Sequence, residues 1–370
     1  MADKVLAAVQ TAPEATELRE FALPEIDVDA ALLKVEAAGV CGSDVGGYKR
    51  MGAAPRILGH ENVGIIARAG AAFARRWGVK EGDRVAIEEY LSCGHCDLCL
   101  RGEFRHCAAT DLHSNPSALR YGNTPITTPP SLWGGYSQYL YMPPETVLHH
   151  MPAHVPHEQS AMALPLGNGV QWAVVEAQTG PGRSIVIMGP GQQGLGGVLA
   201  AKAAGADLVI LTGLARDERR LEVGRQLGAD YVITADGEDV RDRVREITSG
   251  KGVDAVVDTT SAPASEMVPL AIDLVKRKEG RIVVQSLGGT IANFPIEALA
   301  RKYITVKAAR GHSYASVELA IQRIASGKYP LNLLTTHHFG LEGVDLAIKS
   351  TGGTGLPGAI HVTVLPWAST

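Results

Sequence analysis

Short runs of apolar, mostly β-branched residues alternate with polar-faced, helix-forming segments through the middle of the chain. The apolar runs predict buried strands at residues 184–188, 207–212, 231–234, 253–259 and 281–287. The segments between them predict helices at residues 195–204, 216–227, 240–249 and 265–278. Strands and helices in this alternation are typical of a parallel sheet covered on both faces. We therefore predict an α/β, doubly wound Rossmann domain over residues 156–305.

The pattern before this domain is different. Short apolar runs at residues 4–9, 31–36, 63–68, 84–88 and 134–142 are separated by glycine and proline turns, which predicts an antiparallel or barrel-like β domain over residues 1–155. Four prolines between residues 143 and 156 indicate the crossover into the Rossmann domain. A helix at 316–327 and an apolar strand at 359–365 predict that residues 306–370 return to the first domain.

A glycine turn follows the strand at 184–188. Gly189, Gly191 and Gly194 form G-x-G-x-x-G around Gln192 and Gln193, and a helix follows. In this context the glycines permit a tight turn, a close approach of a pyrophosphate and close packing of helix on strand. The pattern predicts a dinucleotide site, and the alternative is a glycine-rich turn without a ligand.

Charge and hydropathy narrow the class of protein. The 370 residues carry a formal net charge of −4 and no basic stripe, which argues against nucleic acid as a main partner. The N-terminal residues lack the apolar core of a secretory signal, and no 18-residue apolar run occurs. We therefore expect a cytoplasmic protein that does not enter a membrane.

Four of the five cysteines lie close together in the sequence. Cys93, Cys96, Cys99 and Cys107 form C-x2-C-x2-C-x7-C, a spacing that in a reducing compartment favours a metal site over disulfides. Four thiolates around tetrahedral Zn²⁺ make a closed, structural site, here in a lobe at about residues 90–110. An iron–sulfur cluster is the competing interpretation, and unrelated free thiols are the third.

The fifth cysteine lies in a different motif. Cys41 and Ser43 belong to G-V-C-G-S-D, and His60 and Glu61 follow in G-H-E. A thiolate, an imidazole and a carboxylate can give Zn²⁺ three protein ligands and leave one position open for water or substrate. Taken alone, one cysteine and one histidine are equally well explained as core residues.

Several motifs together resemble the zinc-dependent medium-chain dehydrogenase/reductase family, the alcohol, sorbitol and threonine dehydrogenase group. They are G-V-C-G-S-D, G-H-E, E-G-D-R-V at residues 81–85, the four-cysteine lobe, G-G-Y-S-Q-Y, P-L-G-N at residues 165–168 and G-P-G-Q-Q-G, in family order. The resemblance implies a GroES-like β-barrel catalytic domain beside the Rossmann domain. It also implies an enzyme that interconverts an alcohol and its carbonyl compound by hydride transfer with NAD or NADP, as a homodimer or homotetramer.

The resemblance also assigns roles to residues. Cys41, His60 and Glu61 match catalytic zinc ligands, and Ser43 matches the hydroxyl that takes the substrate proton. The four clustered cysteines match the ligands of the lobe zinc. The residues expected to contact the dinucleotide are Gly189, Gly191, Gln192, Gln193, Gly194, Gly213, Arg216 and Leu287.

Two positions near the predicted metal site depart from the family. Leu164 stands where the sorbitol and threonine branches carry an acid before Pro-Leu, and an apolar side chain cannot ligate zinc. Gly46 stands where relatives often carry a histidine, which leaves Tyr48, Lys49 or water for a proton relay. These departures keep open a zinc-independent enone or quinone reductase, and a non-catalytic dinucleotide-binding protein.

The end of the second Rossmann strand bears on cofactor choice. NAD enzymes usually carry an acid there, whereas this chain has Gly213. A glycine leaves room for a 2′-phosphate that Arg216, Arg219 or Arg220 could pair with, so the sequence favours NADP over NAD. The alternative is that Asp217 reaches the ribose from a lengthened loop.

The long segment at residues 108–132 is the candidate for substrate specificity, because loops of this length are often functional. Leu112, His113, Tyr121, Leu132 and Trp133 are candidate pocket residues, with packing or surface roles as the alternative. Because Leu164 is apolar, we expect a secondary, apolar or cyclic alcohol.

Overall fold

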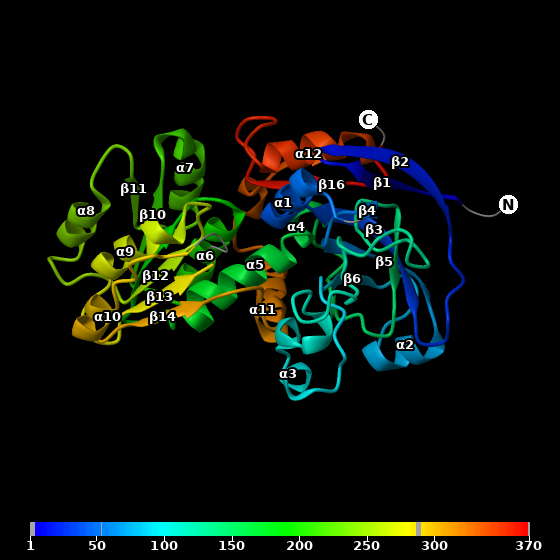
Figure 1. The fold of residues 1–370 in the computed structure, drawn as a ribbon, viewed down its shortest axis with the longest axis horizontal. Coiled ribbons are helices and arrows are strands. Elements are labelled where there is room, and N and C mark those ends of the chain that lie inside the picture. The colour runs from blue at the N-terminus through cyan, green and yellow to red at the C-terminus, as the bar shows by residue number, and fades with distance from the viewer. Residues whose placement is uncertain (1–3, 53, 286–289, 369–370) are drawn as a thin grey trace. The chain divides into compact units, whose positions relative to one another are not determined.

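The computed structural model describes residues 4–52, 54–285 and 290–368. The chain forms two compact units (Figure 1). Unit 1 combines Met1–Leu164 with Ser313–Thr370, and unit 2 is Pro165–His312. The two divisions between the units lie a few residues beyond the domain boundaries expected from the sequence. Leu287, one of the residues expected to contact the dinucleotide, lies outside the described residues.

Unit 2 contains a six-stranded parallel sheet in the order β11-β10-β9-β12-β13-β14. Its strands are β9 (Ser184–Met188), β10 (Leu208–Gly213), β11 (Tyr231–Thr234), β12 (Ala255–Asp258), β13 (Arg281–Val284) and β14 (Thr305–Ala308). Its helices are α6 (Gln192–Ala203), α7 (Glu218–Gln226), α8 (Val240–Ile247), α9 (Ala264–Leu274) and α10 (Ile296–Lys302). The doubly wound sheet is therefore confirmed.

Helices cover both faces of this sheet, as the alternating pattern predicted. On one face, Ile187 contacts α6 at Gly197 and Leu211 contacts α7 at Gly224. On the other face, Met188 joins a buried cluster with residues of α8 and α9. The sixth strand, β14, was not predicted, because it is a largely exposed edge strand whose sequence, T-V-K-A, lacks a continuous apolar run.

Unit 1 is built on β-sheets. A seven-stranded sheet has the order β15-β16-β3-β5-β6-β8 with β7 beside β3, and a three-stranded sheet has the order β2-β1-β4. The strands are β1 (Lys4–Ala12), β2 (Ala15–Ala22), β3 (Ala31–Gly39), β4 (Arg56–Ile57), β5 (Glu61–Ala69), β6 (Arg84–Ile87), β7 (Tyr139–Met142), β8 (Leu148–His150), β15 (Thr335–Phe339) and β16 (His361–Val364). The helices are α1 (Gly42–Arg50), α2 (Ala71–Trp77), α3 (Asp97–Leu100), α4 (His157–Ser160), α11 (Tyr314–Ala325) and α12 (Val344–Thr351), while α5 (Ala163–Val170) runs across the division between the units.

The C-terminal part of the chain belongs to unit 1, where β16 pairs with β3. The expected strand at 134–142 is shorter, because β7 begins at Tyr139 and the backbone of residues 135–138 bonds instead to the segments at 58–59 and 6–8. A Cβ on Gly134 would lie 2.1 Å from the Ile57 carbonyl oxygen, and one on Gly135 would lie 1.6 Å from Asn62 Oδ1. The proline-rich segment expected to be a simple crossover contains β8, so the chain stays in unit 1 longer than predicted.

A buried histidine connects the returning helix α11 to the β-sheet. His149 Nε2 lies 2.9 Å from Glu88 Oε1, and Nδ1 lies 2.6 Å from Glu318 Oε1. The imidazole also stacks on the ring of Tyr314, with 4.3 Å between the ring centroids. Burial alone would lower the pKa of His149, but the two carboxylates offset burial and raise it above the ordinary 6.5.

This contact should make stability depend on pH. A pKa raised in the folded state means that the stabilisation is complete below the unfolded pKa and is lost as pH rises through the folded pKa. His149→Gln should therefore reduce the loss of stability that occurs as pH rises above about 6.5, measured as the urea midpoint. His95→Gln, at an exposed histidine, is the control. An unchanged pH dependence in His149→Gln would contradict the assignment.

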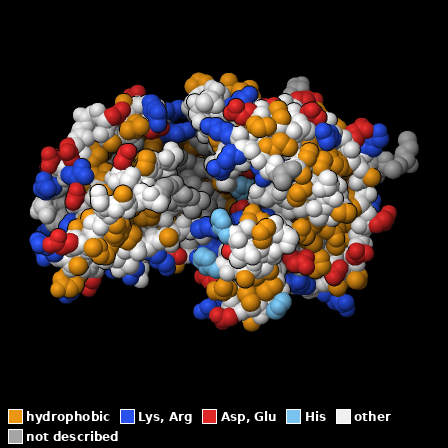
Figure 2. All heavy atoms as spheres, in the orientation of Figure 1, with side chains coloured by type: hydrophobic (Ala, Val, Ile, Leu, Met, Phe, Trp, Pro, Cys, Tyr) orange, Lys and Arg blue, Asp and Glu red, His pale blue; other side chains and the backbone are white. Residues whose placement is uncertain are grey.

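The distribution of charged side chains on the surface agrees with the absence of a basic stripe in the sequence. Figure 2 shows acidic and basic side chains interspersed over the face in view, in both units. Among the described residues, no helix is both long enough and apolar enough to cross a membrane.

Candidate active site

Helix α1 places the first group of candidate residues. Cys41 precedes the first helical residue, and Ser43 and Asp44 lie in the first turn. The Asp44 carboxylate turns back and accepts a hydrogen bond from the Cys41 backbone N–H at 3.0 Å. This reciprocal cap stabilises the start of the helix and holds Cys41 in place.

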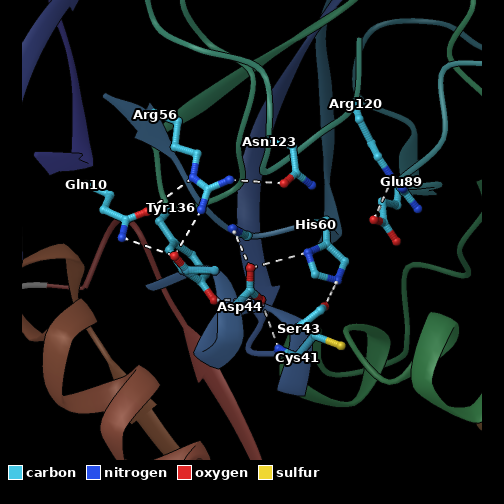
Figure 3. A network of polar contacts seen from close by, with 12 residues as sticks. Gln10, Cys41, Ser43, Asp44, Arg56, His60, Glu89, Arg120, Asn123 and Tyr136 are labelled. Atoms are coloured by element: carbon cyan, nitrogen blue, oxygen red, sulfur yellow. Dashed lines mark hydrogen bonds and ion pairs between the residues drawn. The ribbon is translucent and has the colours of Figure 1, made fainter. Parts of the chain in front are cut away.

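Asp44 is at the centre of the polar network in Figure 3. Besides capping Cys41, its carboxylate accepts hydrogen bonds from the Gly59 N–H at 3.3 Å and the Tyr136 hydroxyl at 3.2 Å. Its Oδ1 lies 3.3 Å from His60 Nδ1. Burial would raise the pKa of Asp44, but His60 and the backbone donors outweigh burial and lower it. Asp44 therefore supports the site as a buried carboxylate.

The motif G-H-E adjoins the start of β5. Gly59 has a φ of +89°, and a Cβ on it would lie 2.6 Å from the Tyr136 ring, so both the backbone and the packing require glycine there. His60 then points back toward α1, where its Nε2 lies 3.3 Å from Ser43 Oγ. With Nδ1 facing Asp44, the carboxylate fixes the imidazole and leaves Nε2 as the nitrogen that can bind a metal.

The charges at this site are strongly perturbed by burial. Burial raises the pKa of Glu61 to about 7, against the lowering effect of His60. Burial also raises the pKa of the Cys41 thiol, and the charge of Glu61 adds to that effect. Groups that are costly to ionise in isolation become favourable ligands for a divalent cation, because the cation stabilises their charged forms.

The structure brings the three predicted ligands together. One ligand atom from each of Cys41, His60 and Glu61 lies within 4.8 Å of the others. A thiolate, an imidazole nitrogen and a carboxylate oxygen are ligand types that Zn²⁺ accepts in its catalytic sites. The donor set therefore fits a zinc ion with three protein ligands.

The four-cysteine lobe also fits one ion. Cys99 Sγ lies 3.5 Å from Cys96 Sγ and 3.9 Å from Cys93 Sγ, and the ligand atoms of all four cysteines lie within 4.8 Å of one another. A tetrahedron with Zn–S bonds of about 2.3 Å has edges of about 3.8 Å. A four-iron cluster would need a wider spacing between the cysteine sulfurs, because each cysteine would bind a different iron. Zinc is therefore the better fit.

The glycine turn has the expected geometry in unit 2. Gly189 has a φ of +97°, and a Cβ on Gly194 would lie 1.9 Å from the Gly189 carbonyl oxygen. A Cβ on Gly191 would contact nothing within 4 Å, so the backbone at the start of α6 borders open space. Gln192 and Gln193 form the first turn of that helix. Close approach of an anion to this helix N-terminus is sterically possible.

The end of the second Rossmann strand, β10, shows how Gly213 and the residues after it pack. A Cβ on Gly213 would lie 2.8 Å from Pro190 and 2.9 Å from Leu221, so packing alone requires glycine there. Arg216 is exposed. Asp217 accepts a hydrogen bond from the Leu214 N–H at 3.2 Å and lies 3.4 Å from Arg220, which directs its carboxylate into its own loop.

The segment at 108–132 contributes backbone, where side chains were expected. Tyr121, Leu132 and Trp133 are core residues of unit 1, and His113 is exposed. Gly122, in contrast, lies beside the imidazole, since a Cβ on it would be 3.4 Å from His60 Nδ1. This contact and the roles of Asp44 and Tyr136 were not predicted, because each depends on residues far apart in the sequence.

The expected relay candidate Tyr48 is also placed elsewhere. Its side chain is 1% exposed, and its hydroxyl donates a hydrogen bond to the Glu14 carbonyl oxygen. Leu164 is buried, with 4% of its surface exposed.

Comparison with known proteins identifies the family. Residues 27–153 match the alcohol dehydrogenase GroES-like domain, and residues 194–326 match the zinc-binding dehydrogenase domain. A probable alcohol dehydrogenase of Mycobacterium tuberculosis is 36% identical over 371 residues, 98% of each chain. Sorbitol dehydrogenase of Bacillus subtilis is 33% identical over 287 residues, 76% of this chain and 74% of the relative.

Solved structures agree with these sequence matches. An alcohol dehydrogenase from Thermotoga maritima has a TM-score of 0.83 and 25% identity, over 98% of this chain and 99% of that chain. The chain belongs to the zinc-dependent medium-chain dehydrogenase/reductase family and is an NAD(P)-linked alcohol oxidoreductase.

Proposed function

We propose that Cys41, His60 and Glu61 hold a catalytic zinc and that Ser43 takes the substrate proton. The observation that carries the proposal is the contact between Asp44 and His60 Nδ1, at 3.3 Å. A second carboxylate that orients a histidine in this way is the usual outer support of a zinc ligand. An unligated core histidine would not need a buried carboxylate beside a cysteine and a glutamate.

The chain's own residues then prepare the reaction. Bound zinc supplies a Lewis acid that favours loss of a proton from the substrate alcohol. Ser43 Oγ, which lies 3.3 Å from His60 Nε2, would accept that proton while its own hydroxyl proton passes outward. Asp44 keeps the His60 ring in one orientation, and Gly122 closes the site on the Nδ1 side of the ring. Hydride transfer to the dinucleotide completes the oxidation.

The first test is the zinc content of the purified chain together with its activity on a panel of alcohols and ketones. Two zincs per chain and alcohol oxidation support the proposal. One zinc per chain, with reduction of enones or quinones, would support the zinc-independent reductase instead. One zinc with dinucleotide binding and no turnover would support a non-catalytic protein.

We propose a secondary alcohol as the substrate, apolar or cyclic in character. The apolar Leu164 supports this class, because it stands where polyol-oxidising branches carry an acid. The relatives include enzymes named for alcohols, sorbitol and threonine, so the panel should compare cyclic alcohols with polyols.

We also propose that the cofactor is NADP, recognised through Arg216. Asp217 hydrogen-bonds within its own loop, and the exposed Arg216 is available to a 2′-phosphate. Arg216→Ala should reduce the ratio of kcat/KM for NADPH over NADH by about tenfold or more, because a charge-assisted contact contributes about 1.5–3 kcal/mol. Arg225→Ala, in the last turn of α7, is the control, because Arg225 pairs with Glu222. A wild type that prefers NADH, or an unchanged ratio in Arg216→Ala, would contradict the proposal.

A homodimer or homotetramer in the cytoplasm completes the proposal. The edge strand β14 supports self-association, because an edge strand can pair with another chain. Tyr303 and Ile296 close to it are 77% and 66% exposed. The clustered cysteines suit a reducing compartment. Light scattering on the purified protein measures the oligomeric state.

A further inference from the structure

The end of β3 carries a glycine against which two buried side chains pack. A Cβ on Gly39 would lie 2.5 Å from Glu61 Oε2 and 2.8 Å from His361 Cε1. Both distances are shorter than real side-chain contacts, so Glu61 and His361 together fill the space above this glycine. Neither the sequence motifs nor the polar network around Asp44 includes His361.

The strand register explains why these residues meet. Gly39 is paired with Glu61 on β5 and with Thr363 on β16, and residues directly opposite in antiparallel strands share one face. His361 lies two residues before Thr363 and is therefore on the same face. The Val40 N–H donates to the Val362 carbonyl oxygen at 2.9 Å, which carries the pairing of the two chain segments toward His361.

Burial restricts both side chains. Glu61 is 3% exposed and His361 is completely buried. Burial lowers the pKa of His361 to about 3, and His338 adds to this effect. The imidazole therefore acts on Glu61 through the space that the two side chains share above Gly39.

Glu61 therefore has neighbours on two sides. One of its carboxylate oxygens belongs to the group of ligand atoms with Cys41 and His60, and Oε2 lies at Gly39 beside His361. A carboxylate beside a metal site can rotate toward the metal or withdraw from it. In this chain the space into which Glu61 would withdraw, above Gly39, is shared with an imidazole.

We propose that His361 is a positioning residue that holds the Glu61 carboxylate against the zinc site formed with Cys41 and His60. The inference rests on the proposed catalytic zinc. It assigns to the C-terminal strand β16 a part in metal binding, although β16 supplies no ligand. Residues that support a ligand in this way typically contribute about 10- to 100-fold to metal affinity or activity.

The test is His361→Ala in the full-length enzyme, titrated with a chelator while released zinc is counted. The variant should release one zinc at about 10- to 100-fold lower chelator concentration than wild type. The lobe zinc should be released as in wild type, which makes it an internal reference. A second measurement replaces both zincs with Co²⁺ and records the absorption spectrum. The bands that disappear in Cys41→Ser belong to the catalytic site. These bands should shift in His361→Ala, because the Glu61 carboxylate moves.

Three variants separate positioning from general stability. His338→Ala, on the neighbouring strand β15, removes an exposed histidine and should behave as wild type. His361→Gln keeps a polar group of similar reach and should recover most of the affinity. Gly39→Ala should weaken the same zinc, because its Cβ would overlap both the Glu61 carboxylate and the His361 imidazole.

The outcomes distinguish the two proposals. A wild type that holds only the lobe zinc would overturn the catalytic zinc itself. A wild type with two zincs, together with His361→Ala of unchanged affinity and unchanged Co²⁺ spectrum, would overturn the role of His361 alone. Equal weakening of both zincs in His361→Ala would also overturn it, because that result would show a general loss of stability.

Discussion

Cys41→Ser is expected to remove one of two zincs per chain and to abolish alcohol oxidation. In the proposed site the thiolate is one of three protein ligands, and a hydroxyl is a much poorer ligand for zinc. Lewis-acid stabilisation of developing charge is worth several kcal/mol. Because each 1.4 kcal/mol is a factor of ten in rate, kcat should fall by at least about a thousandfold.

The measurement is zinc per chain together with turnover over a panel of alcohols and ketones. Binding of NADPH should be unchanged, since the glycine turn belongs to unit 2. Ser43→Ala is the matched control, because it removes the neighbouring hydroxyl and should slow turnover while both zincs remain. Equal zinc content and equal rates in Cys41→Ser and wild type would exclude the metal mechanism and favour the zinc-independent reductase.

Cys99→Ser is expected to release the lobe zinc and to unfold the segment around residues 93–107. Cys99 Sγ is within 3.9 Å of two other cysteine sulfurs, so its loss opens the closed coordination sphere. The free energy of metal binding in such sites contributes directly to folding, and it amounts to about 10–16 kcal/mol in zinc-finger peptides. Without the zinc, the remaining core of the lobe is the small apolar cluster of Tyr90, Phe104 and Val147.

Limited proteolysis and thermal unfolding measure this effect, together with zinc content. The variant should be cleaved within the lobe under conditions where wild type is intact, and its Tm should be lower. His95→Ala is the control, because His95 is exposed and four sulfurs already complete the site. Full zinc content and an unchanged Tm in Cys99→Ser would show that the lobe does not depend on a metal.

Local patterns in the sequence were sufficient wherever one segment supplies the whole feature. The strand β9 has the bounds that its apolar run predicted, and β11 also agrees. The glycine turn is equally local, since Gly189 and Gly194 act on each other within one turn. The four cysteines of the lobe lie within fifteen consecutive residues, so their spacing alone indicated one metal site.

Contacts between side chains from distant segments could not be predicted from the sequence. The sequence places Asp44 beside Cys41, but only the fold brings His60, Gly59 and Tyr136 to its carboxylate. Likewise, only the fold shows that Gly213 packs against Pro190 and Leu221.

The sequence by itself therefore determined the fold class, the family and the residue types of the four-cysteine site and of the proposed catalytic site. Each of these depends on short-range periodicity or on motifs that a single segment carries. The tertiary structure decided which side chains support the ligands, because supports such as Asp44 and His361 act through contacts between strands and helices far apart in the chain. Strand register at β3, β5 and β16 sets those contacts, and register follows from packing of the whole sheet.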